Sequence, residues 1–487
     1  MNFNSYEYLI FFFVVTVLYF RLKPEWRRYL LLAASYYFYM KWQPSYVLIL
    51  LSSTIVDYWS GLRMHACKPG IRKNLYLLAS LVVNIGLLFS FKYYGLFRHT
   101  LILSGNVFQQ DWSLPILDVL LPVGVSFIAF QSLSYTIDVY RGRMEPEPSF
   151  TRFALYVSFF PQLVAGPIER ATHLLPQLRK TYSFETGRVV DGLKMITWGM
   201  FKKVVVADRL AVIANTVYSD ASEFNGAQLL LATVLFGYQI YCDFSGYSDI
   251  AIGSAKVLGV DLMTNFDRPY ISRSIAEFWR RWHISLSTWF RDYLYIPLGG
   301  NRCSRRRWVI NTMVVFLVSG LWHGANYTFV VWGFLHGVYI LVGESTKTWR
   351  ASVARAAGLD RIPHLHSALQ RLTVFSLVTF SWIFFRAQSL NEALAIVRRL
   401  PGGWGELSFE SLPGFCSAMG TTVSGMAVAL LLIVFVEWIS HIERGNQVRE
   451  LMNHHPWYIR WAVYALWVLA ILDLGDPTPI PFIYFQF

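Results

Sequence analysis

Residues 309–342 read VINTMVVFLVSGLWHGANYTFVVWGFLHGVYILV, two apolar runs separated by one short polar interruption. With their flanks, both runs are long enough to cross a hydrocarbon core about 30 Å thick. His323 lies in the interruption, at a depth where an ionisable side chain is costly unless it has a partner or a task. The string therefore predicts two membrane helices with a functional histidine between them. The alternative is a histidine that only hydrogen-bonds across two helices.

The composition extends this prediction to the whole chain. Of 487 residues, 55% are hydrophobic and 15% are charged, which is far more apolar than a soluble protein of this length. We therefore expect an all-α polytopic membrane protein with about ten to twelve spans. Apolar windows recur at Tyr8–Phe20, Val47–Leu62, Leu75–Phe91, Ile116–Ile137, Leu229–Cys242, Val309–Leu321, Tyr327–Val342, Leu372–Phe385, Val423–Trp438 and Trp461–Leu472.

No long polar stretch interrupts this pattern, so the prediction is a single membrane domain over residues 1–487. Its motifs concentrate between residues 120 and 340, and an extended tail follows over residues 475–487. The formal net charge is +13, but the basic residues lie in short segments between apolar runs. This distribution indicates loops that set the membrane orientation and contact anionic lipid headgroups, and it does not indicate a nucleic-acid-binding surface. Basic residues between Arg21 and Arg28 place that loop in the cytoplasm. The four cysteines have no metal or redox spacing, and no metal site is expected.

The segment Phe159–Arg170 departs from a regular span. Pro161, Gly166 and Pro167 interrupt an otherwise apolar run, which breaks a helix and releases backbone groups from their partners. Within a membrane such a segment has to line a cavity or be buried in protein. A short surface loop between two spans is the alternative.

A second unusual segment is Ser274–Arg291. Its first residues, Ser274-x-x-Glu277, form a capping-box pattern, which predicts a helix that begins at Ser274 and continues through Arg291. On one continuous helix, His283 would share a face with Trp279, Leu286 and Phe290 and would line the substrate route. The alternative is an amphipathic helix at the membrane interface.

Two histidines at membrane depth favour proton-transfer chemistry. Histidine takes a proton from a hydroxyl or gives one to a leaving group near neutral pH. The sequence lacks a nucleophile elbow, a P-loop and a zinc-protease motif, so no residues carry hydrolase or ATPase chemistry. Acyl transfer to a hydroxyl needs only a base, a group that orients or polarises, and a channel for each substrate. Gly320-x-x-x-Gly324 and Gly333-x-x-x-Gly337 also predict close helix packing around His323.

Six ordered motifs extend from the first third to the last third of the chain. They are Leu121–Phe127, Ala165–Ile168, Tyr241–Asp249, Glu277–Ser287, Tyr295–Arg302 and Leu321–Gly324. Together they resemble the membrane-bound O-acyltransferase family, and within it the bacterial branch that O-acetylates cell-envelope polysaccharides. The membrane subunit of alginate O-acetylation is the nearest type.

The resemblance implies a helical domain with re-entrant segments around a central funnel that opens to the cytosol for an acyl thioester and outward for the acceptor. It implies that His323 is the essential catalytic histidine and that His283 is a second position acting as a proton shuttle. The expected substrate-binding residues are Trp282, Arg280, Arg281 and Asp249, and either arginine is expected to meet the diphosphate of coenzyme A.

The function expected from this resemblance is that of a multi-pass inner-membrane O-acetyltransferase. Acetyl-CoA is expected as the donor substrate, without a bound cofactor, and the acceptor is alginate, peptidoglycan or cellulose outside the cytoplasm. A separate periplasmic SGNH-like acetyltransferase is implied as partner. The main alternative is a transporter or flippase of a polysaccharide export system, suggested by the broken central segment and by the carboxylates Asp138 and Asp243. A third hypothesis is a membrane scaffold for a polysaccharide export complex, which would need neither histidine.

The C-terminal tip suggests a covalent relay. Residues 482–487 read Phe-x-Tyr-x-x-Phe, which resembles the C-terminal motif of the small acyl-carrying subunit in teichoic-acid D-alanylation. We therefore expect Tyr484 to attack the thioester after deprotonation by His323. An aromatic anchor at the outer interface is the alternative.

Overall fold

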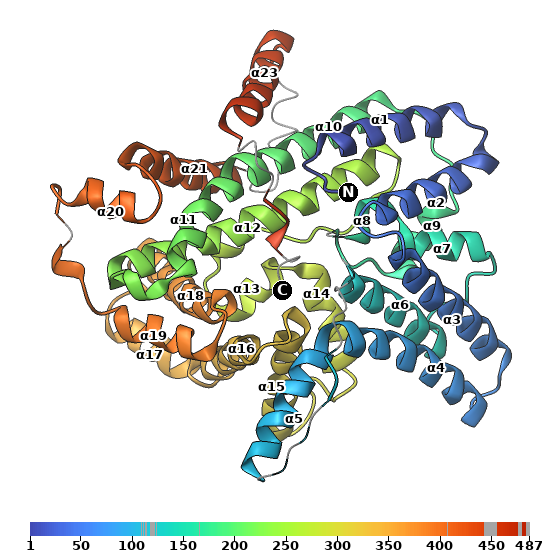
Figure 1. Ribbon diagram of the computed structural model, residues 1–487, viewed down its shortest axis with the longest axis horizontal. Coiled ribbons are helices and arrows are strands. Elements are labelled where there is room, and N and C mark those ends of the chain that lie inside the picture. The colour runs from blue at the N-terminus through green and yellow to red at the C-terminus, as the bar shows by residue number, and fades with distance from the viewer. Residues whose placement is uncertain are drawn as a thin grey trace. The chain divides into compact units, whose positions relative to one another are not determined.

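The computed structural model describes residues 1–487 except 109, 111, 113, 117–121, 123, 165, 407, 443–454, 476–479 and 484–487. Within the described residues the regular structure is helical and contains no strand, which confirms the all-α prediction (Figure 1). The chain divides into two compact units. The first comprises Met1–Ile196 and Tyr247–Thr264, and the second comprises Thr197–Gly246 and Asn265–Phe487. That the whole chain acts as one membrane domain stays a prediction.

The first unit begins with long helices and continues with shorter ones. They are α1 (Tyr6–Arg21), α2 (Pro24–Met40), α3 (Tyr46–Ala66), α4 (Ile71–Leu88), the π-helix η1 (Phe89–Tyr93), α5 (Tyr94–Val107), α6 (Val125–Tyr140), α7 (Phe150–Ser158), α8 (Phe160–Leu163), α9 (Ala171–Leu178) and most of α10 (Thr186–Met200). The last residues of α12 also belong to this unit.

The second unit holds both motif histidines. Its helices are η2 (Phe201–Ala207), α11 (Asp208–Ser219), η3 (Ala221–Glu223), most of α12 (Gly226–Val257), η4 (Pro269–Ile271), α13 (Ile275–Arg281), α14 (Ile284–Phe290), η5 (Arg291–Tyr295), α15 (Arg305–His323), α16 (Tyr327–Ser345), α17 (Lys347–Ala356), α18 (Pro363–Arg386), α19 (Leu390–Arg399), η6 (Trp404–Glu406), α20 (Leu412–Ala418), α21 (Val423–Ile442) and α23 (Trp457–Leu474).

Six helical segments of the described chain are long and apolar enough to cross a membrane. They are Ile71–Gly105, Gly226–Val257, Tyr327–Ser345, Pro363–Arg386, Val423–Ile442 and Trp457–Leu474. The chain is therefore a multi-pass membrane protein. The total of ten to twelve spans stays a prediction, because α1, α2 and α6 have 16, 17 and 16 residues and fall short of the roughly 20 that an upright crossing needs.

The proline-rich segment of the first unit is broken and buried. α7 ends at Ser158, α8 is a single turn over Phe160–Leu163, and α9 starts only at Ala171. All described residues from 159 to 170 are buried. A Cβ on Gly166 would lie 2.3 Å from the Cα of Gln162, so the chain packs here too tightly for any side chain. The prediction of an irregular segment buried in protein is confirmed, and the surface-loop alternative is wrong.

The continuous helix predicted over Ser274–Arg291 is wrong, because two short helices replace it. Its start is as expected, since the Ser274 hydroxyl accepts a hydrogen bond from the Glu277 amide at 3.1 Å. After α13, however, Trp282 is extended and His283 adopts a left-handed conformation with φ 43°, and only then does α14 begin. His283 therefore does not share a helical face with Trp279.

A segment outside these helices causes the break. The backbone carbonyl of Asn265 accepts the Ile284 amide at 2.9 Å, and the Asn265 side chain accepts the Ser285 amide at 3.3 Å. The Arg281 carbonyl accepts the Asp267 amide at 2.9 Å. These bonds satisfy backbone groups that a continuous helix would pair internally, so the chain can turn at His283 without leaving buried amides unpaired.

α15 and α16 form a tight hairpin and lie side by side in Figure 1. A Cβ on Gly320 would lie 2.2 Å from the Phe329 carbonyl oxygen, and a Cβ on Gly333 would lie 2.3 Å from that of Phe316. A Cβ on Gly324 would lie 2.1 Å from the Phe329 ring. The close packing predicted from the glycine spacing is confirmed, and it fixes the connection in which His323 lies.

Candidate active site

His323 is the last residue of α15, where Gly324 turns the chain toward α16. Its side chain is 3% exposed and is surrounded by aromatic rings. The rings of Trp322 and Trp332 each lie 4.9 Å from the imidazole, and that of Phe385 lies 5.4 Å away, all edge-on. We call Trp322, Trp332 and Phe385 the aromatic box. It holds the imidazole of His323 in one orientation and shields it from bulk water.

His283 lies close to the same box. Its ring is 5.9 Å from Trp322, so one indole contacts both motif histidines. On another side, Phe244 lies edge-on at 4.7 Å. The Nδ1 atom of His283 is 3.1 Å from Oδ1 of Asn265. Burial lowers the pKa of the His283 imidazole to about 3, so the ring is neutral at physiological pH.

Trp282 is part of the packing beside these histidines. It is 1% exposed and stacks on Phe278 at 5.5 Å. The rings of Phe266 and Trp382 lie 5.1 and 5.2 Å from it. These contacts explain how Trp282 supports the site, whereas its predicted role in substrate binding stays a prediction.

The two arginines of α13 have different surroundings. Arg281 forms ion pairs with Glu277 at 3.0 Å and with Asp267 at 3.1 Å, so its charge is already engaged. Arg280 is exposed and borders a large cavity. Asp249 lies on α12 within the first unit and is partly buried. Of the two arginines, Arg280 is therefore better placed to meet a phosphate.

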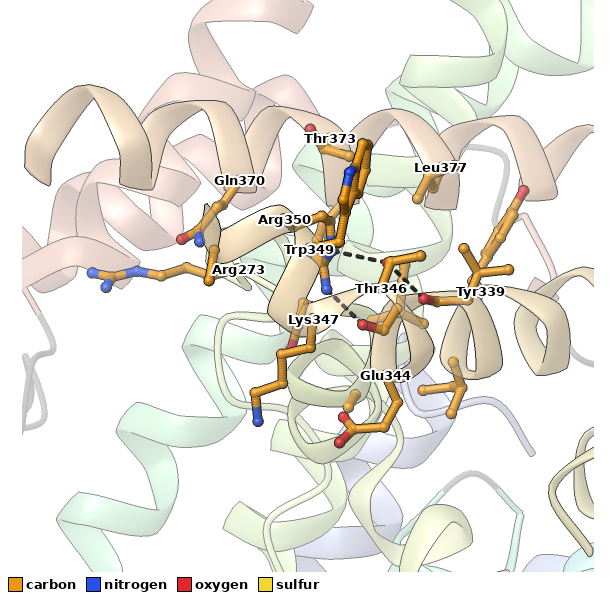
Figure 2. Close-up of a pocket in the computed structure, with 18 of the residues that line it drawn as sticks. Arg273, Tyr339, Glu344, Thr346, Lys347, Trp349, Arg350, Gln370, Thr373 and Leu377 are labelled. Atoms are coloured by element: carbon orange, nitrogen blue, oxygen red, sulfur yellow. Dashed lines mark hydrogen bonds between the residues drawn. The ribbon is translucent and has the colours of Figure 1, made fainter. Parts of the chain in front are cut away.

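The cavity beside Arg280 has a volume of about 1740 Å³ and is strongly basic (Figure 2). The described residues that line it include one carboxylate, Glu344, and five cationic side chains: Arg273, Arg280, Arg305, Lys347 and Arg350. Arg350 is anchored to the Thr346 hydroxyl at 3.2 Å, as the dashed line in Figure 2 shows. A cavity of this size and charge is suited to a polyanionic ligand.

The described part of the tail lies against the core of the second unit. Phe482 is fully buried, and its ring is 5.6 Å from Phe244, which also contacts His283. The Ile483 amide donates a hydrogen bond of 2.8 Å to Asp243. Asp243 in turn pairs with Lys203 at 2.9 Å. Tyr484 itself lies outside the described residues.

Lys203 connects two buried carboxylates. Its ammonium group lies 2.7 Å from Asp208 and 2.9 Å from Asp243, and all three side chains are at most 3% exposed. We call Lys203, Asp208 and Asp243 the buried triad. Asp243, which suggested a transport pathway in the sequence, is thus one member of a cluster that binds the tail backbone.

A third buried histidine, His336, was missed by sequence reasoning. Its Nδ1 accepts a hydrogen bond from the Trp279 indole at 3.2 Å, so in the neutral ring Nε2 carries the proton. Nε2 then donates to the Ser381 hydroxyl at 2.9 Å, and that hydroxyl donates to the Val378 carbonyl at 2.7 Å. Both ring nitrogens are engaged, so His336 connects α13, α16 and α18 and does not activate Ser381.

Sequence reasoning also missed Asn265 and Lys203, which lie outside the quoted motifs. Lys203 follows another lysine at the end of an apolar run. A lysine at such a position is costly in a membrane protein, and this cost was the sequence signal that could have pointed to Lys203. Asn265 gave no such signal, because an asparagine near a proline is usually a turn residue. Only the fold brings it to His283.

Comparison with known proteins shows which family this chain resembles. A family model for the membrane-bound O-acyltransferases matches residues 145–384. The probable alginate O-acetylase of Pseudomonas putida is 34% identical and covers 100% of both chains, and that of Pseudomonas aeruginosa is 37% identical over 89% of this chain and 81% of its own. The peptidoglycan O-acetyltransferase of Helicobacter pylori is 33% identical over 78% of this chain and 74% of its own.

The matched region contains both motif histidines, α13 to α16 and most of α18. The full-length match to the Pseudomonas putida protein extends the similarity to the tail. The resemblance seen in the six motifs is thereby confirmed. The chain belongs to the membrane-bound O-acyltransferase family of enzymes.

Proposed function

We propose that this enzyme takes acetyl groups from cytosolic acetyl-CoA and passes them across the bacterial inner membrane to an extracytoplasmic polysaccharide. Alginate is the first candidate acceptor and peptidoglycan the second, because relatives of 34 to 37% and of 33% identity carry those names; cellulose is a third. A separate periplasmic SGNH-like acetyltransferase completes the transfer to the sugar. The resemblance of the six motifs to the polysaccharide-acetylating branch is what supports such a partner.

The observation that carries this proposal is the pair of buried histidines beside one indole. His323 and His283 both contact Trp322. Phe482, in the described part of the tail, contacts Phe244, whose ring also contacts His283. Two bases held in a dry, rigid surrounding are suited to moving protons between a hydroxyl and a thiolate.

In the proposed relay, the phenol oxygen of Tyr484 attacks the thioester carbonyl while His323 takes the phenol proton. The carbon–sulfur bond breaks, and the coenzyme A thiolate leaves and takes that proton, so the histidine returns to its neutral form. The acetyl ester on Tyr484 then passes to the partner. A phenol leaves more readily than a sugar hydroxyl, so the second transfer needs no further energy source.

The basic cavity is the proposed entrance for the donor. Coenzyme A carries a diphosphate and a further phosphate, and Arg280 with its four cationic neighbours offers several charge-assisted contacts to them. Because Arg281 is already held by Glu277 and Asp267, we assign the main diphosphate contact to Arg280.

The test is thiol release from acetyl-CoA by the purified full-length enzyme in lipid nanodiscs. With its periplasmic partner and an acceptor present, the wild-type enzyme should release coenzyme A, and His323→Gln should lower kcat at least about 100-fold. His336→Gln is the matched control, because it also alters a buried histidine but should retain most activity in the folded fraction. Wild-type rates in His323→Gln would refute the assignment of the base, and no thiol release by the wild type would refute the donor.

A further inference from the structure

One side-chain oxygen, Oδ1 of Asn265, receives several donors at the break between α13 and α14. The Ser285 amide lies 3.3 Å from it, the Ser285 hydroxyl 3.0 Å and Nδ1 of His283 3.1 Å. Asn265 is 1% exposed, and Ser285 and His283 are fully buried. The contacts are therefore made where water does not compete for them.

These contacts determine which ring nitrogen of His283 carries the proton. A backbone amide can only donate, so the Asn265 atom that faces the Ser285 amide is the oxygen and not the nitrogen. An amide oxygen can only accept. Nδ1 of His283 must therefore be the protonated nitrogen, and in a neutral imidazole Nε2 then carries the lone pair.

We infer that Asn265 is a positioning residue that holds His283 in the Nδ1–H tautomer, so that Nε2 is the atom that accepts a proton during acetyl transfer. This inference rests on the proposed function for its catalytic meaning. The tautomer itself follows from the hydrogen bonds alone.

The same asparagine fixes the place of the imidazole as well as its tautomer. Its carbonyl accepts the Ile284 amide, and its side chain caps α14 through the Ser285 amide. His283 lies between them with a positive φ of 43°, a conformation that a residue other than glycine adopts only when its surroundings hold it. Asn265 therefore sets the backbone and the ring of His283 together.

His336 shows the opposite arrangement within the same unit. There the Trp279 indole donates to Nδ1, which leaves the proton on Nε2. His283 and His336 are thus held as different tautomers, His336 by a donor at Nδ1 and His283 by an acceptor at Nδ1. This gives each ring a distinct spectroscopic signature in one protein.

The first experiment reads the tautomer directly. Full-length protein labelled with ¹⁵N and ¹³C in its histidines is studied in lipid by solid-state NMR, and the His283 signal is the one lost in His283→Gln. The wild type should show the proton on Nδ1, and Asn265→Ala should shift population to the Nε2–H form. Asn265→Asp and Ser285→Ala should keep the wild-type tautomer. An Nε2–H signal in the wild type, or an unchanged signal in Asn265→Ala, overturns the inference.

The second experiment measures turnover. Asn265→Ala should lower kcat about 100-fold and leave the KM for acetyl-CoA within twofold, whereas Asn265→Asp should recover most of the loss, because a wrong tautomer disables a base without weakening substrate binding. Ser304→Ala, which removes the hydroxyl cap of α15, controls for the general cost of losing a helix cap. Equal losses in Asn265→Ala, Asn265→Asp and Ser304→Ala would reduce Asn265 to a structural cap and overturn its positioning role.

The two experiments separate this inference from the proposed function. If the wild type releases no thiol from acetyl-CoA, the proposed function fails while the NMR result still decides the tautomer. If the wild type is active and the NMR signal shows Nε2–H, only the role of Asn265 fails.

Discussion

At the scale of single residues, the substitution Tyr484→Phe separates a covalent relay from an aromatic anchor. It removes only the phenol oxygen and keeps the ring. Under the proposed relay it should abolish polysaccharide acetylation and the acetyl ester that mass spectrometry would detect on the C-terminal peptide of the wild type after incubation with acetyl-CoA. Normal acetylation in Tyr484→Phe would leave the tail as an anchor.

The sequence was informative at this scale where one residue was out of place in its own segment. His323 could be found because an imidazole among apolar residues is costly wherever the chain folds. His336 lies in the same apolar string, but its role depends on Trp279 and Ser381, which are distant in sequence. The cost of an imidazole among apolar residues therefore marks both histidines, but remote partners leave no local signal, so the role of His336 could not be predicted, and neither could that of Asn265.

At the scale of helices, the α15–α16 hairpin should tolerate no side chain at its crossing. Gly333→Ala places a methyl group 2.3 Å from the Phe316 carbonyl oxygen, so the helices must separate. We expect a loss of about 1–3 kcal/mol in stability, measured as a lower thermal midpoint in lipid nanodiscs, together with reduced turnover as His323 shifts. Gly343→Ala is the matched control on the same helix, because a Cβ there meets nothing within 4 Å. Equal midpoints for both variants would contradict the packing described.

Another prediction at this scale concerns α13. Arg280→Ala should raise the KM for acetyl-CoA about tenfold with little change in kcat, because a charge-assisted contact that binds donor in the ground state is lost. Arg281→Ala should affect thermal stability more than KM, since it removes two ion pairs. Arg355→Ala on α17 changes a cation outside the cavity lining and serves as the surface control. An unchanged KM in Arg280→Ala would exclude the diphosphate contact.

The start of α13 could be predicted because Ser274 and Glu277 carry their capping chemistry within four residues. Its end could not. The residues from Trp282 to Leu286 have no helix breaker, and their pattern suits a continuous helix. The break results from backbone hydrogen bonds to Asn265, a tertiary contact that outweighs local propensity.

At the scale of the whole molecule, the stability should depend on pH through two ion clusters outside the candidate spans. The hydrogen bond and charge of Glu169 raise the pKa of His173 despite its partial burial. A raised pKa in the folded state means that this stabilisation is complete below the unfolded value of about 6.5 and is lost as pH rises through the folded value. The thermal midpoint should therefore fall as pH rises above about 6.5, and His173→Gln should flatten that slope. An equal slope in this variant would contradict the assignment.

The second cluster acts in acid. Burial alone would raise the pKa of Glu147, but hydrogen bonds from Arg179, the Ser149 amide and Arg152 lower it below its usual value. This stabilisation is present above the unfolded value of about 4.5 and is lost as pH falls through the folded value. Glu147→Gln should therefore reduce the fall of the thermal midpoint in acid, and an unchanged fall would contradict the role of this cluster.

The bond between Ile483 and Asp243 also bears on the order in which the protein is made. It joins positions 240 residues apart, so Asp243 meets this partner only after the residues between them and Ile483 itself have left the ribosome. Until then the buried triad has an acceptor that nothing from the tail satisfies, and an unsatisfied carboxylate oxygen in a dry interior favours partly open states. Synthesis through Ile483 thus supplies a donor to the buried triad. Nascent chains released before residue 483 should accordingly be recognised and degraded by membrane proteases faster than full-length ones.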